Sequence, residues 1–241
     1  MRRTLHFLAI LTAAAFVFLS CSAKLADQKG LTASDLFSRG QQRMAKKKYD
    51  SAIEHFQLLL ERFPTSPLAP RAQLALADAY MENEDNVEAE VGYDDFLRLY
   101  PASDNVPYAL SRKGDLLFRQ AGKPGRDQTK TFEAIRTYQL LLDKYSSSPY
   151  AAVAAKRIAE LRNRLAEHEV AVVSHYLSRK NYESAEARAR RAVADYPDTT
   201  SLSTLMSLLA DALDRQGKKE EAAEVRKSLR EKFQGTGDKK R

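Results

Sequence analysis

The sequence predicts an all-α protein, a solenoid of about five helix pairs, and three observations lead to this prediction. The 241 residues include only 9 Gly and 8 Pro, while Ala, Leu, Arg, Lys and Glu, which favour helices, are frequent. A short motif centred on alanine recurs along the chain. In the glycine- and proline-free segment that follows Pro149, apolar residues recur at roughly helical spacing. Stacked repeats of this kind bury their apolar faces only against their neighbours.

The chain begins with a segment typical of a secretory signal. Arg2 and Arg3 precede an apolar run from Leu5 to Leu19. This run is shorter than the ~20 residues that a helix needs to cross a bilayer, and a short apolar run after a positive start is typical of a cleaved signal peptide. We therefore expect a signal peptide over residues 1–20.

The end of that segment resembles the lipobox of bacterial lipoproteins, in which a cysteine becomes the lipidated first residue. Cys21, the only cysteine, directly follows the small residue Ser20. We expect Cys21 to carry covalent lipid, including palmitate, because two or more acyl chains anchor a protein stably whereas one does not. Ser22, in place of Asp, favours the outer membrane, and residues 21–32 are expected to form a polar tether. The alternative is an ordinary signal peptide with an incidental cysteine.

The repeated motif defines the helix pairs. In each recurrence a small alanine marks the point where two helices cross closely, and in three of them an aromatic residue four positions later fills the adjacent groove: Phe56, Tyr93 and Tyr138. The alanines are spaced by 37, 45, 51 and 37 residues: Ala52, Ala89, Ala134, Ala185 and Ala222. This pattern resembles the tetratricopeptide repeat, an antiparallel pair of helices of about 34 residues. We expect the repeats to occupy residues 33–234, followed by a polar tail over 235–241.

Serines and glycines are expected to set the helix ends and crossings. Ser66 and Ser148, each followed by proline, match a serine N-cap with proline in the first turn. Gly40 and Gly114 match the small-residue position of the repeat, and Gly217 matches a helix stop.

Two segments depart from the regular spacing. Residues 118–130 are expected to form an extended loop inside the third repeat, with Asp127 or Thr129 capping the helix that follows. From Pro149 to Lys180 there is no further glycine or proline, and apolar residues recur at roughly helical spacing. The sequence therefore predicts one long helix near 149–180.

Composition and spacing argue against several classes of function. The formal net charge is +7, and without Arg2 and Arg3 it is about +5, a weak excess from which we expect no nucleic-acid partner. A single cysteine excludes an internal disulfide. His168 and His175 are seven residues apart rather than the four of a helical zinc motif, so no metal site is expected. We also expect no catalytic residues and no cofactor other than the lipid on Cys21.

The repeat register places nine residues on the concave face as a candidate groove for a partner segment. Apolar side chains among polar ones suit an extended or aromatic-bearing segment. The alternative for each residue is a place in the core. The candidates are Phe37, Gln41 and Met44 in repeat one, Leu74, Asp78 and Met81 in repeat two, and Ser111, Asp115 and Phe118 in repeat three.

Residues 148 to 199 carry motifs more specific than the repeat itself. They are Ser148-Pro149-Tyr150-Ala151, Arg164-Leu165-Ala166-x-His168-Glu169 and Asp195-Tyr196-Pro197-Asp198-Thr199. With the lipobox, these motifs resemble the BamD family, the lipoprotein subunit of the β-barrel assembly machinery of Gram-negative bacteria. The resemblance implies a non-enzymatic periplasmic scaffold tethered to the outer membrane.

The resemblance also implies partners. In that family the C-terminal repeats dock on the last POTRA domain of the barrel-forming subunit, and the N-terminal repeats are linked to recognition of unfolded outer-membrane proteins. Other assembly lipoproteins are further candidate partners. The family has an interface arginine on the helix leading to Asp-Tyr-Pro-Asp-Thr. By this resemblance, counting back seven residues from Asp195 gives Arg188 here, with Arg190 and Arg191 as alternatives. A guanidinium fork suits a carboxylate on the partner.

Two other functions stay open at this point. A periplasmic repeat protein that coordinates Tol-Pal or peptidoglycan-related envelope maintenance also carries such repeats, but it usually lacks the lipobox and the Arg-x-x-Leu-Ala-x-His-Glu helix. A lytic enzyme with a helical body needs a further catalytic domain, for which the residues after Phe233 leave little room.

Overall fold

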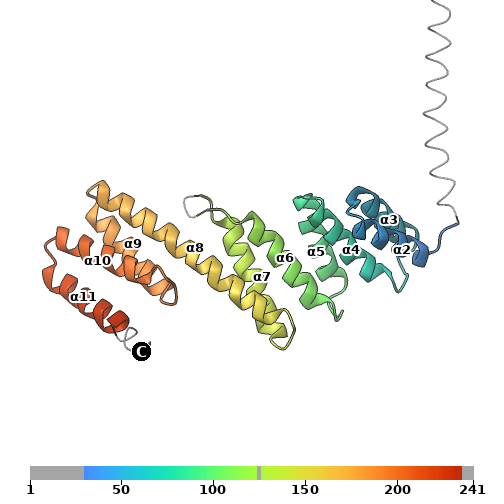
Figure 1. The fold of residues 1–241 in the computed structure, drawn as a ribbon. Helices are drawn as coiled ribbons and strands as arrows, with labels where there is room; N and C mark the ends of the chain where they lie inside the picture. Colours follow the sequence, from blue (N-terminus) through green and yellow to red (C-terminus); the bar gives the residue numbers. More distant parts are fainter. Residues whose placement is uncertain (1–29, 124–125, 235–241) are drawn as a thin grey trace, which may run out of the picture. The chain divides into compact units, whose positions relative to one another are not determined.

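The computed structural model describes residues 30–123 and 126–234, and within these ranges every regular element is a helix (Figure 1). The predicted signal peptide over 1–20, the lipidation site Cys21, most of the tether and the polar tail over 235–241 lie outside the described residues. Among the residues described, no helix combines the length and the apolar character that a bilayer crossing requires.

The helices divide between two compact units, with the boundary inside α5, after Gly92. The first unit contains α2 (Ala33–Ala45), α3 (Tyr49–Arg62), α4 (Ala69–Glu82) and the start of α5 (Asn86–Leu99). The second contains the rest of α5 and α6 (Val106–Gln120), α7 (Thr129–Tyr145), α8 (Ala151–Ser178), α9 (Tyr182–Asp195), α10 (Leu202–Arg215) and α11 (Lys219–Gln234). The predicted fold class, an all-α tetratricopeptide-repeat solenoid with one long helix, is confirmed.

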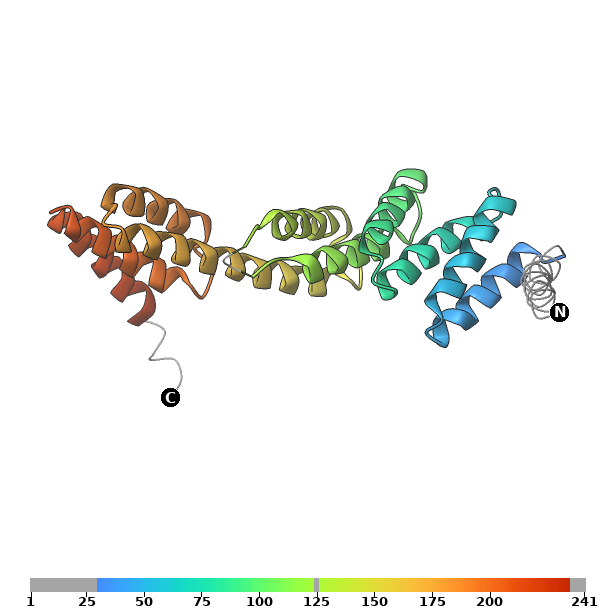
Figure 2. The same cartoon turned by 90° about the horizontal axis from the view of Figure 1, so that it is seen from above.

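Helix α8 is the long helix that the sequence predicted near 149–180. It has 28 residues, and neither glycine nor proline interrupts it. In Figure 2 it passes from the α6–α7 pair to α9 and α10, and it packs against all four of these helices. One uninterrupted element therefore joins the two ends of the second unit.

Two glycines allow helices to cross at close range, as predicted. A Cβ atom built on Gly40 would lie 2.4 Å from the ring of Phe56, and one built on Gly114 would lie 2.4 Å from the ring of Tyr138. Both rings are fully buried. Any larger residue at either glycine would force the aromatic ring or the helix to move, because packed interiors have no spare volume.

Four of the helix pairs share one turn geometry between their two helices. The backbone has positive φ at Lys47 (54°), Glu84 (67°), Lys180 (59°) and Gly217 (79°), in the left-handed region. In each turn the next residue donates its N–H to a carbonyl five residues back, for example Lys218 N to Leu213 O at 3.0 Å. This is the Schellman helix end. Gly217 is therefore a helix stop, as the sequence predicted.

The predicted serine N-caps are wrong. The N-cap of α4 is Leu68 and that of α8 is Tyr150, neither with a capping side chain. Ser66 instead shapes the preceding turn, because its Oγ accepts from Leu68 N at 3.2 Å and its carbonyl accepts from Ala69 N at 2.9 Å. Each helix thus begins three residues after its serine. At the start of α7 the N-cap residue is Gln128, without a capping side chain, rather than Asp127 or Thr129 as predicted, and Asp127 beside it accepts from Thr129 N at 3.1 Å.

A compact apolar core holds α9 among its neighbours. Ala185 and Ala189 on α9 are fully buried with Val173 from α8, Leu213 from α10 and Ala222 from α11. Alanine at these positions lets α9 approach its neighbours closely. The polar faces of α9 are consequently fixed beside α8 on one side and beside α10 and α11 on the other.

Candidate partner-binding site on helix α9

The predicted interface residue Arg188 lies in a small hollow formed by α7, α8 and the C-terminal half of α9. The hollow has a volume of about 220 Å³. Its lining combines two aromatic residues with four charged ones: Phe132, Glu169, Arg188, Arg191, Ala192, Asp195 and Tyr196.

Arg188 is held by a carboxylate from the neighbouring helix. Its Nη2 donates to Glu169 Oε1 at 2.8 Å, and its Nε donates to Glu169 Oε2. The Glu169 side chain is 14% exposed and the Arg188 side chain 39%. Hydrogen bonding to Glu169 raises the pKa of the Arg188 guanidinium above its ordinary value. The pair uses only the edge of the guanidinium formed by Nε and Nη2. The two N–H groups of Nη1 and the second N–H group of Nη2 therefore do not donate to Glu169.

Aromatic residues give this hollow an apolar component. Tyr196 is buried, and burial is the main cause that raises the pKa of its phenol, followed by the nearby charge of Glu169. Phe132, at the start of α7, is 46% exposed. A large exposed ring beside an arginine is typical of protein–protein contact surfaces, where aromatic residues and Arg are enriched.

The outer rim carries a weaker ion pair. Arg191 Nε lies 3.4 Å from Asp195 Oδ2, and the Arg191 side chain is 78% exposed. A pair this exposed contributes little to stability. Of the three neighbouring arginines, Arg188 and Arg191 line the hollow, whereas Arg190 points to the opposite face of α9 and pairs with Glu186.

The Asp-Tyr-Pro-Asp-Thr turn that follows α9 is fastened to α8 by Arg162, which begins the Arg-x-x-Leu-Ala-x-His-Glu motif but was not predicted as a site residue. Arg162 donates through Nε to Asp198 Oδ2 at 2.9 Å and through Nη2 to the carbonyl of Asp195 at 2.8 Å. Its guanidinium also lies 5.5 Å from the centroid of the Tyr196 ring. Next to it, Asn163 Oδ1 accepts from Thr200 N at 2.8 Å. Hydrogen bonding to Arg162 lowers the pKa of the Asp198 carboxyl.

Four of the nine predicted groove residues are buried, so the prediction of an exposed groove is wrong for them. They are Phe37, Leu74, Met81 and Ser111. The ring of Phe37 packs against that of Phe56 with centroids 5.8 Å apart, which places it in the core of the first unit.

The other five remain at least partly accessible. Gln41 is exposed, while Met44 is half-buried against the core of the first unit and Asp78 is half-buried. Asp115 accepts a hydrogen bond from the Tyr138 hydroxyl at 2.7 Å, and burial together with this bond raises the pKa of Tyr138 well above its usual range. The ring of Phe118 is covered by Arg157 and Arg164, at 4.2 and 4.4 Å from its centroid.

Comparison with protein families identifies the chain. The family model YfiO, described as outer membrane lipoprotein, matches residues 29–229. The chain belongs to this family. The match includes all the residues that line the hollow around Arg188.

Two named relatives and one solved structure are also similar to this chain. A Neisseria meningitidis protein named outer membrane protein assembly factor BamD is 29% identical over 208 residues, which cover 82% of this chain and 78% of that protein. A Xylella fastidiosa protein of the same name is 28% identical over 236 residues, covering 93% and 81%. Among solved structures, the TPR2AB domain of yeast Sti1 is 18% identical, covers 83% of this chain and 77% of its own, and has a TM-score of 0.43.

No group of three or more potential metal ligands occurs in the parts of this family member that the structure describes. His175 instead lies beside Tyr176, with ring centroids 6.4 Å apart.

Proposed function

We propose that this chain is an outer-membrane lipoprotein subunit of the β-barrel assembly complex. In this proposal it scaffolds the barrel-forming subunit and helps to recognise and insert unfolded outer-membrane proteins. The observation that carries the proposal is the family match over residues 29–229, supported by relatives named outer membrane protein assembly factor. We further propose that it acts without catalysis and is held at the periplasmic face of the outer membrane by lipid on Cys21.

The hollow around Arg188 is the proposed docking site for a POTRA domain of the barrel-forming subunit. Glu169 fixes the guanidinium through one edge, so little side-chain freedom is left to lose when a partner binds. The remaining N–H groups of Arg188 can then donate to a carboxylate of the partner in a fork geometry. Phe132 supplies exposed apolar area next to this contact.

The first unit is the proposed contact for unfolded outer-membrane proteins. Its exposed apolar residues Val87 and Val91 lie one helical turn apart on α5, and Gln41 is exposed on α2. Apolar side chains on one helix face, with polar groups available, suit an extended segment that carries aromatic residues.

The first experiment is purification of the C-terminally tagged chain from membranes in mild detergent, with mass spectrometry of the proteins that accompany it. The proposal predicts a stoichiometric outer-membrane barrel protein with periplasmic POTRA domains. It also predicts that depletion of the chain lowers many outer-membrane barrels together. Recovery of Tol-type or peptidoglycan-bound partners without such a barrel would contradict it.

The anchor is tested separately. Cys21→Ala removes the only acceptor for the proposed lipid, so the protein should become soluble or remain uncleaved. Unaltered retention in the membrane fraction would disprove lipidation at Cys21.

A further inference from the structure

The opposite face of α9 borders a second, larger hollow that has a different character. It lies between the turn joining α8 to α9 and the turn joining α10 to α11, and its volume is about 1110 Å³. This exceeds the range of about 300–1,000 Å³ that is typical of small-molecule sites. A polypeptide segment fits such a space better than a free ion does.

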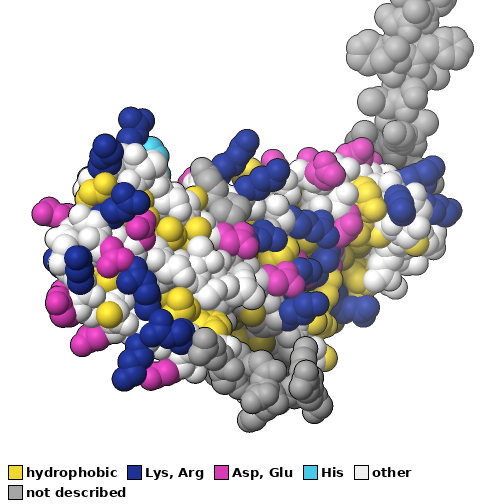
Figure 3. Space-filling model, turned by 60° about the vertical axis from the view of Figure 1, so that its left-hand side comes forward, with side chains coloured by type: hydrophobic (Ala, Val, Ile, Leu, Met, Phe, Trp, Pro, Cys, Tyr) yellow, Lys and Arg dark blue, Asp and Glu magenta, His cyan; other side chains and the backbone are white. Residues whose placement is uncertain are grey.

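The lining of this hollow is polar and carries an excess of positive charge. Five cationic side chains face only two carboxylates: Arg179, Lys180, Arg190, Arg215 and Lys218 against Glu183 and Glu186. On the face seen in Figure 3, basic and acidic side chains are interspersed. In the lining of the hollow, by contrast, cations outnumber carboxylates by three.

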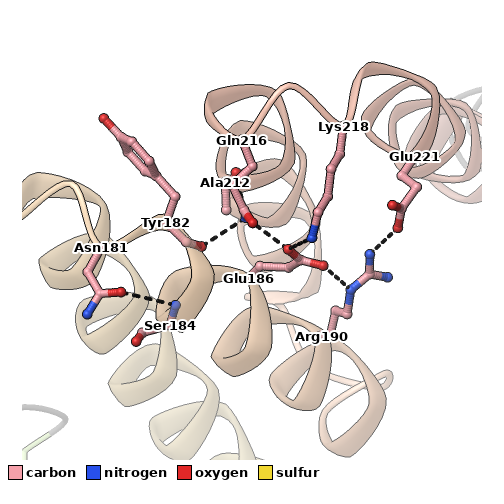
Figure 4. Close-up of polar contacts among 9 residues, drawn as sticks. All are labelled: Asn181, Tyr182, Ser184, Glu186, Arg190, Ala212, Gln216, Lys218 and Glu221. Carbon is pink, nitrogen blue, oxygen red and sulfur yellow. Dashed lines mark hydrogen bonds and ion pairs between the residues drawn. The ribbon is translucent and has the colours of Figure 1, made fainter.

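One carboxylate, that of Glu186, contacts several polar side chains on the inner wall of the hollow (Figure 4). Glu186, 12% exposed, accepts from Lys218 Nζ at 2.7 Å, from Arg190 Nε at 2.8 Å and from Gln216 Nε2 at 2.8 Å. Arg190 also pairs with Glu221 on α11. The hydrogen bond from Lys218 is the main cause that lowers the pKa of the Glu186 carboxyl to about 2. These contacts hold Lys218 and Arg190 in place before any partner arrives.

The remaining cations are available on both walls. Among the residues that the structure describes, no carboxylate pairs with Arg179 or Lys180 on the α8–α9 turn. On the other wall, Arg215 pairs with Asp211 at 3.4 Å, with both side chains about half exposed, a contact that a competing carboxylate can replace.

We propose that this hollow binds an acidic, extended polypeptide segment whose carboxylates reach Arg179 and Lys180 on one wall and Arg215 on the other. Charge complementarity supports this occupant, since the lining has three more cations than carboxylates. A lipid surface suits it less well, because the hollow contains two carboxylates and offers no large apolar side chain for insertion apart from Tyr182.

The test measures binding of fluorescein-labelled hexaglutamate to the detergent-solubilised full chain, with hexaglutamine as the control peptide. We expect hexaglutamate to bind at least about tenfold more tightly and its affinity to fall as salt rises, since screening weakens exposed charges. Arg179→Glu and Arg215→Glu, on opposite walls, should each weaken binding at least about fivefold. Arg230→Glu, an exposed arginine on α11 outside the hollow, changes the net charge equally and should weaken binding less than about twofold.

Three outcomes would overturn the inference. Equal weakening by all three variants would mean that net charge alone drives binding. Equal affinity for hexaglutamine and hexaglutamate would mean that the carboxylates of the peptide do not contribute to binding. Binding to phosphatidylglycerol vesicles but not to hexaglutamate would assign the hollow to lipid headgroups instead. Circular dichroism of each variant checks that the fold is intact, and because the readout is peptide affinity, its failure is distinguishable from failure of the proposed role in barrel assembly.

Discussion

The two faces of helix α9 present surfaces of different chemistry. On the face toward α8, Arg188 pairs with Glu169 beside Phe132 and the buried ring of Tyr196. On the opposite face, Glu186 is surrounded by Arg190 from α9 and by Gln216 and Lys218 from the turn between α10 and α11, with little apolar area. Positions 186 and 188 point in nearly opposite directions because two residues turn a helix by about 200°.

The difference shows how one helix can serve two kinds of partner. A surface that combines an aromatic ring with one fixed arginine favours a folded protein with a complementary apolar patch. A wet, basic hollow favours a charged segment whose affinity depends on salt. Variants on the two faces should therefore change stability and binding in different ways.

Arg188→Glu is expected to have the largest effect on stability. It places a second carboxylate against Glu169, which has little solvent around it, so the free energy of unfolding should fall by about 2–3 kcal/mol. The double variant Arg188→Glu with Glu169→Arg restores an ion pair and should recover all but about 1 kcal/mol. Urea denaturation of the full chain in detergent measures both.

This pair of variants also separates folding from docking. If Arg188 contacts the partner, the double variant should be folded and still recover little barrel-forming subunit. Recovery equal to the wild type in the folded double variant would remove Arg188 from the docking site.

Phe132→Ser should weaken docking with little change in stability. The ring is 46% exposed, so its loss should lower the free energy of unfolding by less than about 0.5 kcal/mol but raise the Kd for the barrel-forming subunit about tenfold. Leu140→Ser is the matched control, because Leu140 lies two turns along the same helix, is 40% exposed and does not line the hollow. Equal effects of the two substitutions would contradict a specific site at Phe132.

Glu186→Gln tests the other face through its pH dependence. The pKa of Glu186 is lower in the folded chain, about 2, than its ordinary 4.5, so its stabilising contribution is complete above about pH 5 and is lost as pH falls toward 2. Removing the charge should lower the free energy of unfolding by about 1 kcal/mol at pH 7. The variant should also lose less stability than the wild type between pH 5 and pH 2. An unchanged acid profile, measured by thermal unfolding, would mean that Glu186 contributes no such coupling.

Lys180→Gly should have a small effect on stability, of the opposite sign. Lys180 adopts positive φ in the turn that borders the basic hollow, a conformation that is easier for glycine. We expect stabilisation by about 0.5–1 kcal/mol. Lys47→Gly at the equivalent turn of the first unit should behave alike, whereas Gly217→Ala should destabilise, and thermal unfolding compares the three.

The repeat positions could be predicted from sequence because they depend on local size and spacing. Ala52 and Ala134, with Phe56 and Tyr138 four residues later, are all fully buried. The long helix was predicted because no residue from 151 to 178 interrupts helical geometry. These features follow from residue type alone.

Burial along one helix was harder to predict. Phe37, Gln41 and Met44 share a face by spacing, yet they range from buried to exposed. The packing of neighbouring helices decides how wide the buried stripe along a helix is. The spacing of residues in the sequence does not reveal this packing. The helix starts at Ser66 and Ser148 were misplaced for a related reason, since turn hydrogen bonds delay each helix by three residues.

The partners of charged residues could not be predicted either. Arg188 meets Glu169 nineteen residues earlier, and Arg162 meets Asp198 thirty-six residues later. Such pairs depend on how α8 and α9 are rotated about their axes. The only available signal was that all four residues fall in the segment of 148–199 that resembles the family most specifically.

The length of α8 has a mechanical consequence. Its 28 residues span about 42 Å, and without glycine or proline the helix has no built-in hinge. It contacts α6 and α7 near one end and α9 and α10 near the other. If a partner displaces the proposed docking face, we therefore expect this rigid helix to transmit the displacement along the second unit rather than a loop to absorb it.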